Sequence, residues 1–289
     1  CLESVRRASQ ELQVEVLVVD NLSTDGSVEY LSKRFPEVTF IANRENVGFA
    51  RANNQAIRLS KGRYVLLLNP DTIVGEDTLA RSVEFMEAHP EAGGVGVHML
   101  NANGTFAPES RRGLPTPFVA FCKMSGLAKR FPKSRLFGRY YMSYLDKREV
   151  NEIEVMSGAY MMLRREALDK VGMLDEDFFM YGEDIDLSYR VLKGGYKNYF
   201  LPVRMLHYKG ESTAKNSYRY AYTFYQAMRL FFRKHFGHYS LIISLPINAA
   251  TWASTFTVYL RNRMRYGRCP RMAELPLNAL VIGDAVMID

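Results

Sequence analysis

Three acidic residues follow an aromatic loop within residues 178–190, at positions Glu183, Asp184 and Asp186. Apolar residues recur behind them at helical spacing, so the sequence predicts a helix that begins with these acids. A helix N-terminus stabilises carboxylates through its partial positive charge. Glu183 or Asp184 could equally act as a general base that takes a proton from an acceptor hydroxyl. Both interpretations remain open from this stretch alone.

A second acidic loop runs from Asp20 to Ser27, after an apolar, β-branched run that predicts a buried strand over 14–20. A carboxylate at such a strand end can accept hydrogen bonds from a nucleobase or a ribose hydroxyl. The alternative is an Asp-Gly turn in which Asp25 or Ser27 caps the next helix.

A third acid, Asp71, follows the most apolar of these strand-like runs, 63–69, in the sequence Asn69-Pro70-Asp71. The proline fixes a turn that presents one carboxylate beyond the strand. A hard divalent cation takes oxygen ligands, and it can stabilise the charge of a departing nucleoside diphosphate. A plain Pro-Asp turn is the structural alternative.

His207 ends a predicted strand and precedes Gly210 and Ser212. A lone histidine most often has a structural role. Here the small residues that follow it can approach a phosphate closely, which favours a role in ligand binding.

The elements that must position these side chains alternate between strands and helices. Strands are predicted at 14–20, 38–42, 63–69, 94–100, 155–163, 196–201 and 203–206, and helices at 2–12, 27–34, 52–59, 78–89, 165–171, 183–193 and 217–236. This alternation predicts an α/β fold with a mostly parallel central sheet and flanking helices. Ligands of such sheets bind at the carboxyl ends of the strands, where Asp20 and Asp71 are expected.

Composition narrows the class of protein. The 289 residues are 47% hydrophobic and carry a net charge of +7, which favours acidic partners such as phosphates or anionic lipids. Lys and Arg are scattered through most of the chain, so no nucleic-acid partner is expected. Three widely spaced cysteines argue against a disulfide framework and against a cysteine zinc site, and they indicate a reducing compartment.

Two segments depart from the alternating pattern. Residues 101–150 contain several prolines and mix basic with aromatic residues, so we expect an irregular insertion, with acceptor contacts at 115–144. Residues 237–289 are expected to form a helical appendage. Within it, 241–260 predicts either helices lying on a membrane or helices packed on the catalytic domain.

Together these motifs resemble the family 2 glycosyltransferases of the GT-A fold, and within them a bacterial rhamnosyltransferase-like branch of surface-polysaccharide assembly. The resemblance covers about residues 2–236, taken as the catalytic domain 1–236. It rests on six stretches in order: 18–27, 46–53, 67–71, 157–159, 178–190 and 207–212.

The resemblance implies a role for each motif. The nucleotide would be bound by Asp20, Asn21, Asp25, Gly48, Phe49, Arg51 and Asn53, and the donor sugar and diphosphate by Asn69, Gly158, Ala159, Gly210 and Ser212. Asp71 and His207 would hold Mg²⁺ or Mn²⁺. Asp184 would be the catalytic base, with Glu183 positioning it or the acceptor, and Asp186 is taken as structural.

The resemblance implies an inverting transfer of a sugar from a nucleotide-diphosphate sugar to a glycan or lipid-linked acceptor. The donor expected first is rhamnose activated on dTDP. The expected location is the cytoplasm, at the inner face of the cell membrane, with peripheral membrane contact. The alternatives are a catalytically silent nucleotide-sugar binder and a nucleotidyltransferase. The latter should carry a phosphate loop rich in Gly, Arg and Lys after the first strand.

Two features depart from the family pattern. Asn69 stands where many relatives have the first Asp of Asp-x-Asp, so more of the metal binding would fall to His207. The family's first strand should precede Cys1. We therefore expect an inner strand to be absent from this chain and its stability or activity to be reduced, which a full-strength donor titration would refute.

Overall fold

The computed structural model describes residues 1–208 and 218–237. Its first half contains α1 Leu2–Ala8, β1 Leu17–Asp20, α2 Ser27–Arg34, β2 Thr39–Ala42, α3 Phe49–Leu59, β3 Tyr64–Leu68, β4 Thr72–Val74, α4 Thr78–Ala88 and β5 Ala92–Asn101. Its second half contains α5 Pro117–Met124, α6 Leu127–Arg130, β6 Asn151–Ile153, β7 Tyr160–Arg164, α7 Arg165–Val171, α8 Glu183–Lys193, β8 Lys197–His207 and α9 Tyr218–His235, with short 3₁₀ helices at Pro108–Ser110 and Gly138–Tyr141.

The larger sheet has the order β3-β7-β5-β8-β4, and β6 pairs with β8. The α/β prediction is confirmed, but the expectation of a mostly parallel sheet is wrong. Among the described strands only β1–β2 and β5–β8 run parallel, whereas the other four pairings are antiparallel. Antiparallel neighbours arise here because β7 and β4 enter the sheet from loops rather than from right-handed helical crossovers.

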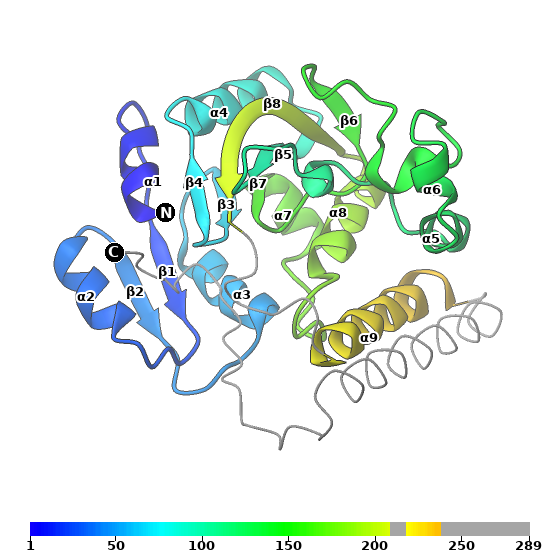
Figure 1. Cartoon of the computed structure of the whole chain (residues 1–289). Helices are drawn as coiled ribbons and strands as arrows, with labels where there is room; N and C mark the ends of the chain where they lie inside the picture. Colours follow the sequence, from blue (N-terminus) through cyan, green and yellow to red (C-terminus); the bar gives the residue numbers. More distant parts are fainter. Residues whose placement is uncertain (209–217, 238–289) are drawn as a thin grey trace.

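Helices cover both faces of this sheet (Figure 1). Along β7, Tyr160 and Met162 join a core with α1 and α4, whereas Met161 and Leu163 join a core with α3, α7 and α8. This is the period-two alternation of a strand buried on both faces. The three-layer arrangement holds the loops at the strand ends in fixed positions.

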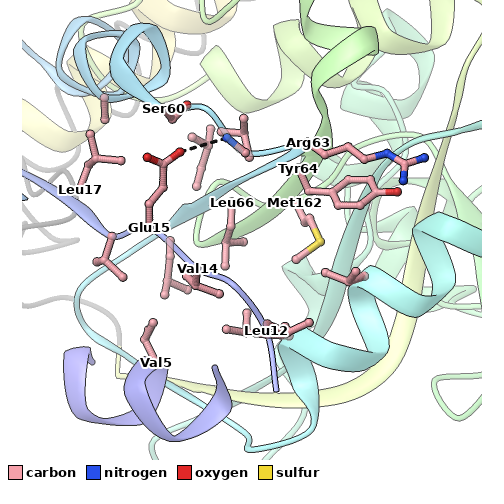
Figure 2. Close-up of a pocket in the computed structure, with 18 of the residues that line it drawn as sticks. Val5, Leu12, Val14, Glu15, Leu17, Ser60, Arg63, Tyr64, Leu66 and Met162 are labelled. Atoms are coloured by element: carbon pink, nitrogen blue, oxygen red, sulfur yellow. Dashed lines mark hydrogen bonds between the residues drawn. The ribbon is translucent and has the colours of Figure 1, made fainter. Parts of the chain in front are cut away.

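β1 and β2 form a separate two-stranded sheet with α2 beside it (Figure 1). A mostly apolar cavity of about 940 Å³ lies between β1 and β3, lined also by α1 and by residues 12–16 (Figure 2). Gly62 N–H donates to Glu15 Oε1 at 3.0 Å across its lining. No described strand pairs with the cavity-side edges of β1 and β3. That an inner strand is absent from this chain stays a prediction.

Three local predictions need correction. The strands expected at 196–201 and 203–206 form one strand, β8, which continues through Pro202. At this point the register between β8 and β5 shifts, between Val97 and His98 of β5. A proline fits such an irregularity because no ladder hydrogen bond is required of it there. The insertion 101–150 is only partly irregular, because α5 and α6 lie within it. The strand at 155–163 begins later, at Tyr160.

The C-terminal half of α9 packs on the acidic helix α8. Asp186 Oδ1 lies 2.6 Å from His235 Nε2 and 2.9 Å from Lys234 Nζ, and its Oδ2 accepts from Arg190 Nε at 2.7 Å. Burial alone would raise the pKa of Asp186, but hydrogen bonds from His235 and Lys234 and the positive charge of Arg190 hold it at about 2. Asp186 therefore connects two helices, as the structural interpretation predicts.

None of the helices in the described ranges is both long and apolar enough to span a bilayer. The predicted appendage 237–289 lies outside the described residues apart from Gly237, as does the segment 241–260.

Candidate functional site

Asp184 lies in the first turn of α8, where the helix N-terminus faces the loop before β7. Its Oδ2 accepts hydrogen bonds from an Arg112 guanidinium N–H and from Gly158 N at 3.2 Å, and its Oδ1 accepts from Ile185 N at 2.8 Å. A carboxylate offers about four lone-pair sites, so three donors leave about one for a further hydroxyl. The side chain is 15% exposed and therefore partly open to a ligand.

Glu183 is buried beside it, with only 6% of its surface exposed. Burial, together with the negative charge of Asp184, raises the pKa of Glu183 to about 8. Its Oε2 has no hydrogen-bond partner among the described residues. At neutral pH Glu183 is therefore protonated, which makes it a poor proton acceptor and leaves Asp184 as the better candidate base.

We expect Glu183→Gln to make the protein less sensitive to alkaline pH. Because the folded pKa is raised above that of the unfolded chain, the folded state retains a proton that the unfolded state releases. Stability therefore falls as pH rises toward about 8. Gln cannot ionise, so the variant should gain roughly 5 °C in melting temperature over the wild type between about pH 6 and pH 9.

Thermal unfolding at the two pH values measures this difference, and Glu166→Gln, an exposed residue on α7, is the matched control. Equal pH dependence in the wild type, the control and Glu183→Gln would show that Glu183 is ionised in the folded state at neutral pH.

Asp71 and His207 meet where β4 pairs with β8. Thr72 lies opposite His207 in the ladder, and Asp71 Oδ1 is 3.1 Å from His207 Nε2. Tyr208 N–H also donates to the Asp71 carbonyl at 2.9 Å. The structure thus brings these two side chains into direct contact, and their binding of a metal stays a prediction.

The donor set at this point fits a divalent cation. Two buried atoms at this point, Asp71 Oδ1 and His207 Nδ1, have no hydrogen-bond partner among the described residues. Asp71 Oδ1 faces the His207 imidazole, but not in a geometry that forms a hydrogen bond. A carboxylate and an imidazole are ordinary ligands of Mn²⁺, and a carboxylate suits Mg²⁺. No cluster of three or more His, Cys, Asp or Glu with metal-site geometry occurs within residues 1–208 and 218–237. Diphosphate and water oxygens would have to supply the remaining ligands.

Asn69, Gly158 and Ala159 connect the two acidic positions. Asn69 N–H donates to the Ala159 carbonyl at 3.1 Å, which extends the antiparallel β3–β7 ladder by one residue. A Cβ placed on Gly158 would lie 3.5 Å from Asp184 Cβ and 3.8 Å from the Phe49 ring. A side chain at Gly158 would therefore occupy the space beside the Asp184 carboxylate and the Phe49 ring.

The acidic loop after β1 is tied to the loop before α3. Asp20 is buried, accepts a hydrogen bond from Ser23 N at 3.1 Å, and leaves Oδ1 without a partner in the described structure. Asn21 Nδ2 donates to the Gly48 carbonyl at 3.4 Å. Gly48 has a φ of +85°, and a Cβ there would lie 2.7 Å from Phe179, so only glycine permits this packing.

The other predicted nucleotide residues are placed less uniformly. Phe49 N–H donates to the Phe179 carbonyl at 2.8 Å, which draws the start of α3 against the aromatic loop. Asn53 is buried, donates to the Phe49 carbonyl at 2.9 Å and lines the cavity of Figure 2. Arg51 is 60% exposed and lies 3.8 Å from Glu176. Nucleotide contacts by all three stay predictions.

Asp25 has the local role that the turn interpretation gave it. Its Oδ1 accepts from Ser27 N at 2.9 Å and from the Ser27 hydroxyl, and these bonds lower the pKa of Asp25. It thereby supports the loop before α2, as expected, while any direct role toward the nucleotide stays a prediction. Gly210 and Ser212 lie outside the described residues.

Arg112 is the site residue that the sequence did not reveal. Besides its ion pair with Asp184 it donates to the Met156 carbonyl at 2.9 Å, so it joins the insertion to the acidic helix. The only sequence signal is an Arg-Arg pair at the start of a basic insertion, 72 positions before its partner. No local pattern links residues at that separation.

Solved structures define the class of this fold. The mannosyltransferase PcManGT from Pyrobaculum calidifontis, in complex with GDP-Man and Mn²⁺, superposes with a TM-score of 0.52 at 19% identity, covering 93% of this chain and 71% of that one. TarS 1–349 from S. aureus gives a TM-score of 0.51 at 19% identity, covering 79% and 58%. The fold is that of the GT-A glycosyltransferases.

The sequence narrows that class to one family. A model described as "Glycosyl transferase family 2" matches residues 1–172, and the chain belongs to this family. The N-acetylglucosaminyl-diphospho-decaprenol L-rhamnosyltransferase of Mycobacterium tuberculosis is 28% identical over 218 residues, covering 71% of this chain and 70% of that protein.

A second curated relative is more distant. The low-salt glycan biosynthesis hexosyltransferase Agl10 of Haloferax volcanii is 26% identical over 180 residues, covering 61% of this chain. This chain spans 52% of that protein's length.

Proposed function

We propose that the chain is an inverting glycosyltransferase that moves a sugar from a nucleotide-diphosphate donor to a hydroxyl of a lipid-linked or surface-polysaccharide acceptor. The observation that carries the proposal is the position of Asp184 against Gly158, one residue from the Asn69–Ala159 hydrogen bond. Asp71, two residues further along, contacts His207. A candidate base and a candidate cation-binding pair thus lie on segments that are joined by the β3–β7 ladder.

The proposed reaction needs a proton acceptor on one side of the anomeric carbon and charge stabilisation on the other. Asp184 takes the proton of the attacking hydroxyl, while Arg112 and the Gly158 N–H hold its carboxylate in place. Glu183, neutral at physiological pH, can donate a hydrogen bond to the acceptor without adding negative charge. A cation bound by Asp71 and His207 would stabilise the departing diphosphate.

The names of two relatives support a choice of donor and acceptor. The mycobacterial relative is named as a rhamnosyltransferase acting on N-acetylglucosaminyl-diphospho-decaprenol, and a further relative from Staphylococcus aureus as a poly-β-1,6-N-acetyl-D-glucosamine synthase. We therefore propose a polyprenyl-diphosphate-linked sugar as acceptor and dTDP-rhamnose as the first donor to test. An acceptor of this kind implies work at the inner face of the cell membrane.

A panel of nucleotide sugars tests the donor half of the proposal. Thermal unfolding of the full chain is followed with dTDP-rhamnose, UDP-N-acetylglucosamine, UDP-glucose and GDP-mannose, each with Mn²⁺, with Mg²⁺ and with EDTA. We expect one donor to raise the melting temperature in the presence of the cation, since a ligand that binds only the folded state stabilises it.

Transfer to a short-chain lipid diphosphate acceptor is then measured with that donor. Donor binding without transfer would favour a catalytically silent nucleotide-sugar binder. Failure of every donor to stabilise the chain would contradict both interpretations.

A further inference from the structure

The segment that carries α5 and α6 has an unusual charge. Residues 110–145 contain eight Lys or Arg and no Asp or Glu, although the whole chain has 31 acidic residues. Five of these cations are exposed and form no ion pair with any residue in the described ranges. Lys123 lies over the Tyr141 ring at 3.8 Å, and the other four are Lys129, Arg130, Lys133 and Arg135. Such a segment attracts an anionic surface.

The same segment exposes large apolar side chains. On α5, Phe121 is 58% and Met124 61% exposed, and Leu136 beyond α6 is 57% exposed. Phe118 and Phe131 are nearly half exposed as well. Val119 and Cys122 are the buried residues of α5, so the helix presents one face to the protein and an apolar face to solvent.

Ring contacts through Phe137 connect the apolar side chains of α5 with those that follow α6. The Phe137 ring lies 6.5 Å from that of Phe118 on α5 and 5.6 Å from that of Phe131, which follows α6. The α5–α6 patch is defined as Phe118, Phe121, Met124, Phe131 and Leu136 with the four cations Lys129, Arg130, Lys133 and Arg135, all of which lie on α5, on α6 or just after α6. Figure 1 places α5 and α6 together at one edge of the molecule, on the side away from β1 and β2.

The patch is also connected to the candidate active site. Arg112, which contacts Asp184, precedes the first residue of α5 by only five positions. Between them, Leu114 N–H donates a hydrogen bond to Glu154 Oε2 at 2.6 Å. A surface that holds α5 against a membrane would thus hold the site at a short distance from that membrane.

We propose that the α5–α6 patch docks on an anionic lipid bilayer, with Phe121, Met124 and Leu136 inserted at the interface and the four cations against lipid phosphates. Exposed aromatic and aliphatic side chains beside unpaired Lys and Arg are the combination that interfacial binding requires. The inference deepens the proposed function, which needs access to a lipid-linked acceptor. It does not depend on catalysis.

Co-sedimentation of the full chain with vesicles tests this inference. Vesicles of phosphatidylcholine with about one-third phosphatidylglycerol should bind the protein, and pure phosphatidylcholine vesicles should bind it at least about tenfold less. Binding should also weaken as NaCl is raised to about 0.5 M.

Two sets of variants locate the contact. Each of two multiple variants should lower binding to anionic vesicles by about tenfold or more. The apolar variant is Phe121→Ser/Met124→Ser/Leu136→Ser, and the charge variant is Lys129→Gln/Arg130→Gln/Lys133→Gln/Arg135→Gln. The matched controls are exposed residues on other elements: Tyr30→Ser/Leu59→Ser/Ile73→Ser for the apolar set and Arg7→Gln/Arg44→Gln/Lys61→Gln/Lys170→Gln for the charged set. These controls should bind like the wild type.

The inference would be overturned if the wild type failed to bind anionic vesicles, or if the patch variants bound them as well as the wild type. It would also be overturned if the control variants lost as much binding as the patch variants. Donor-dependent thermal stabilisation, measured on the same variants, reports on the proposed function separately. If the patch variants lose vesicle binding but keep that stabilisation, the membrane contact and the nucleotide site are distinct. If no donor stabilises the wild type while its vesicle binding is as expected, the proposed function fails and the docking inference stands.

Discussion

Asp184→Asn should lower the rate of sugar transfer by about 10³-fold while leaving donor binding unchanged. The side chain keeps its shape and can still accept from Arg112 and Gly158, but an amide cannot take a proton from the acceptor hydroxyl. Donor binding should persist because the candidate nucleotide residues lie on other loops. Single-turnover transfer with the donor found by thermal screening, alongside a donor titration, measures both quantities.

The control for this substitution is Asp169→Asn, which changes an exposed acid on α7 and should leave transfer unaltered. The outcome that would reassign the base is specific. If Asp184→Asn kept a tenth or more of the wild-type rate and Glu183→Gln lost it, the proton would be taken by Glu183 despite its raised pKa.

Asp71→Asn should abolish the cation dependence of donor binding and lower transfer by roughly 10³-fold, since a divalent cation contributes several kcal/mol to stabilising a leaving diphosphate. Asp71 is the only carboxylate among the residues predicted to bind the metal, because Asn69 is neutral. His207→Gln should have the same effect to a smaller degree. Melting temperatures with donor and Mn²⁺, compared with donor and EDTA, give the measurement.

Asp77→Asn and His89→Gln, which alter exposed side chains at the two ends of α4, are the matched controls. An Asp71→Asn variant whose donor binding still responds to Mn²⁺ as the wild type does would show that the cation is bound elsewhere.

Much of the fold could be predicted from periodicity. The helices α2 and α7 and the strand β3 begin and end within a residue or two of their predicted limits, because each has a clear apolar period and a turn signal at its ends. Strand direction could not be predicted in the same way. A short apolar run gives no sign of whether the strand beside it is parallel or antiparallel. β4 is only three residues long, and the main signal near it in the sequence is the turn at Pro70.

The site was predictable to the extent that its residues lie at strand and helix ends. Asp71 and His207 come together because β4 and β8 pair there, and Asp184 lies in the first turn of α8. Two features depend on tertiary packing instead. The raised pKa of Glu183 needs the burial of its carboxyl group, and the ion pair of Asp184 needs an arginine from a distant insertion.

The cavity between β1 and β3 has a consequence for the behaviour of this chain in concentrated solution. Unpaired strand edges beside an apolar surface are templates on which a second molecule can add its own strands. Glu15, Lys61, Arg63 and Glu87 are the charged residues that line the cavity, and charged side chains beside strand edges oppose such edge-to-edge pairing. Neutralising them should promote aggregation, whereas high salt, which screens the same charges, should do so without any mutation.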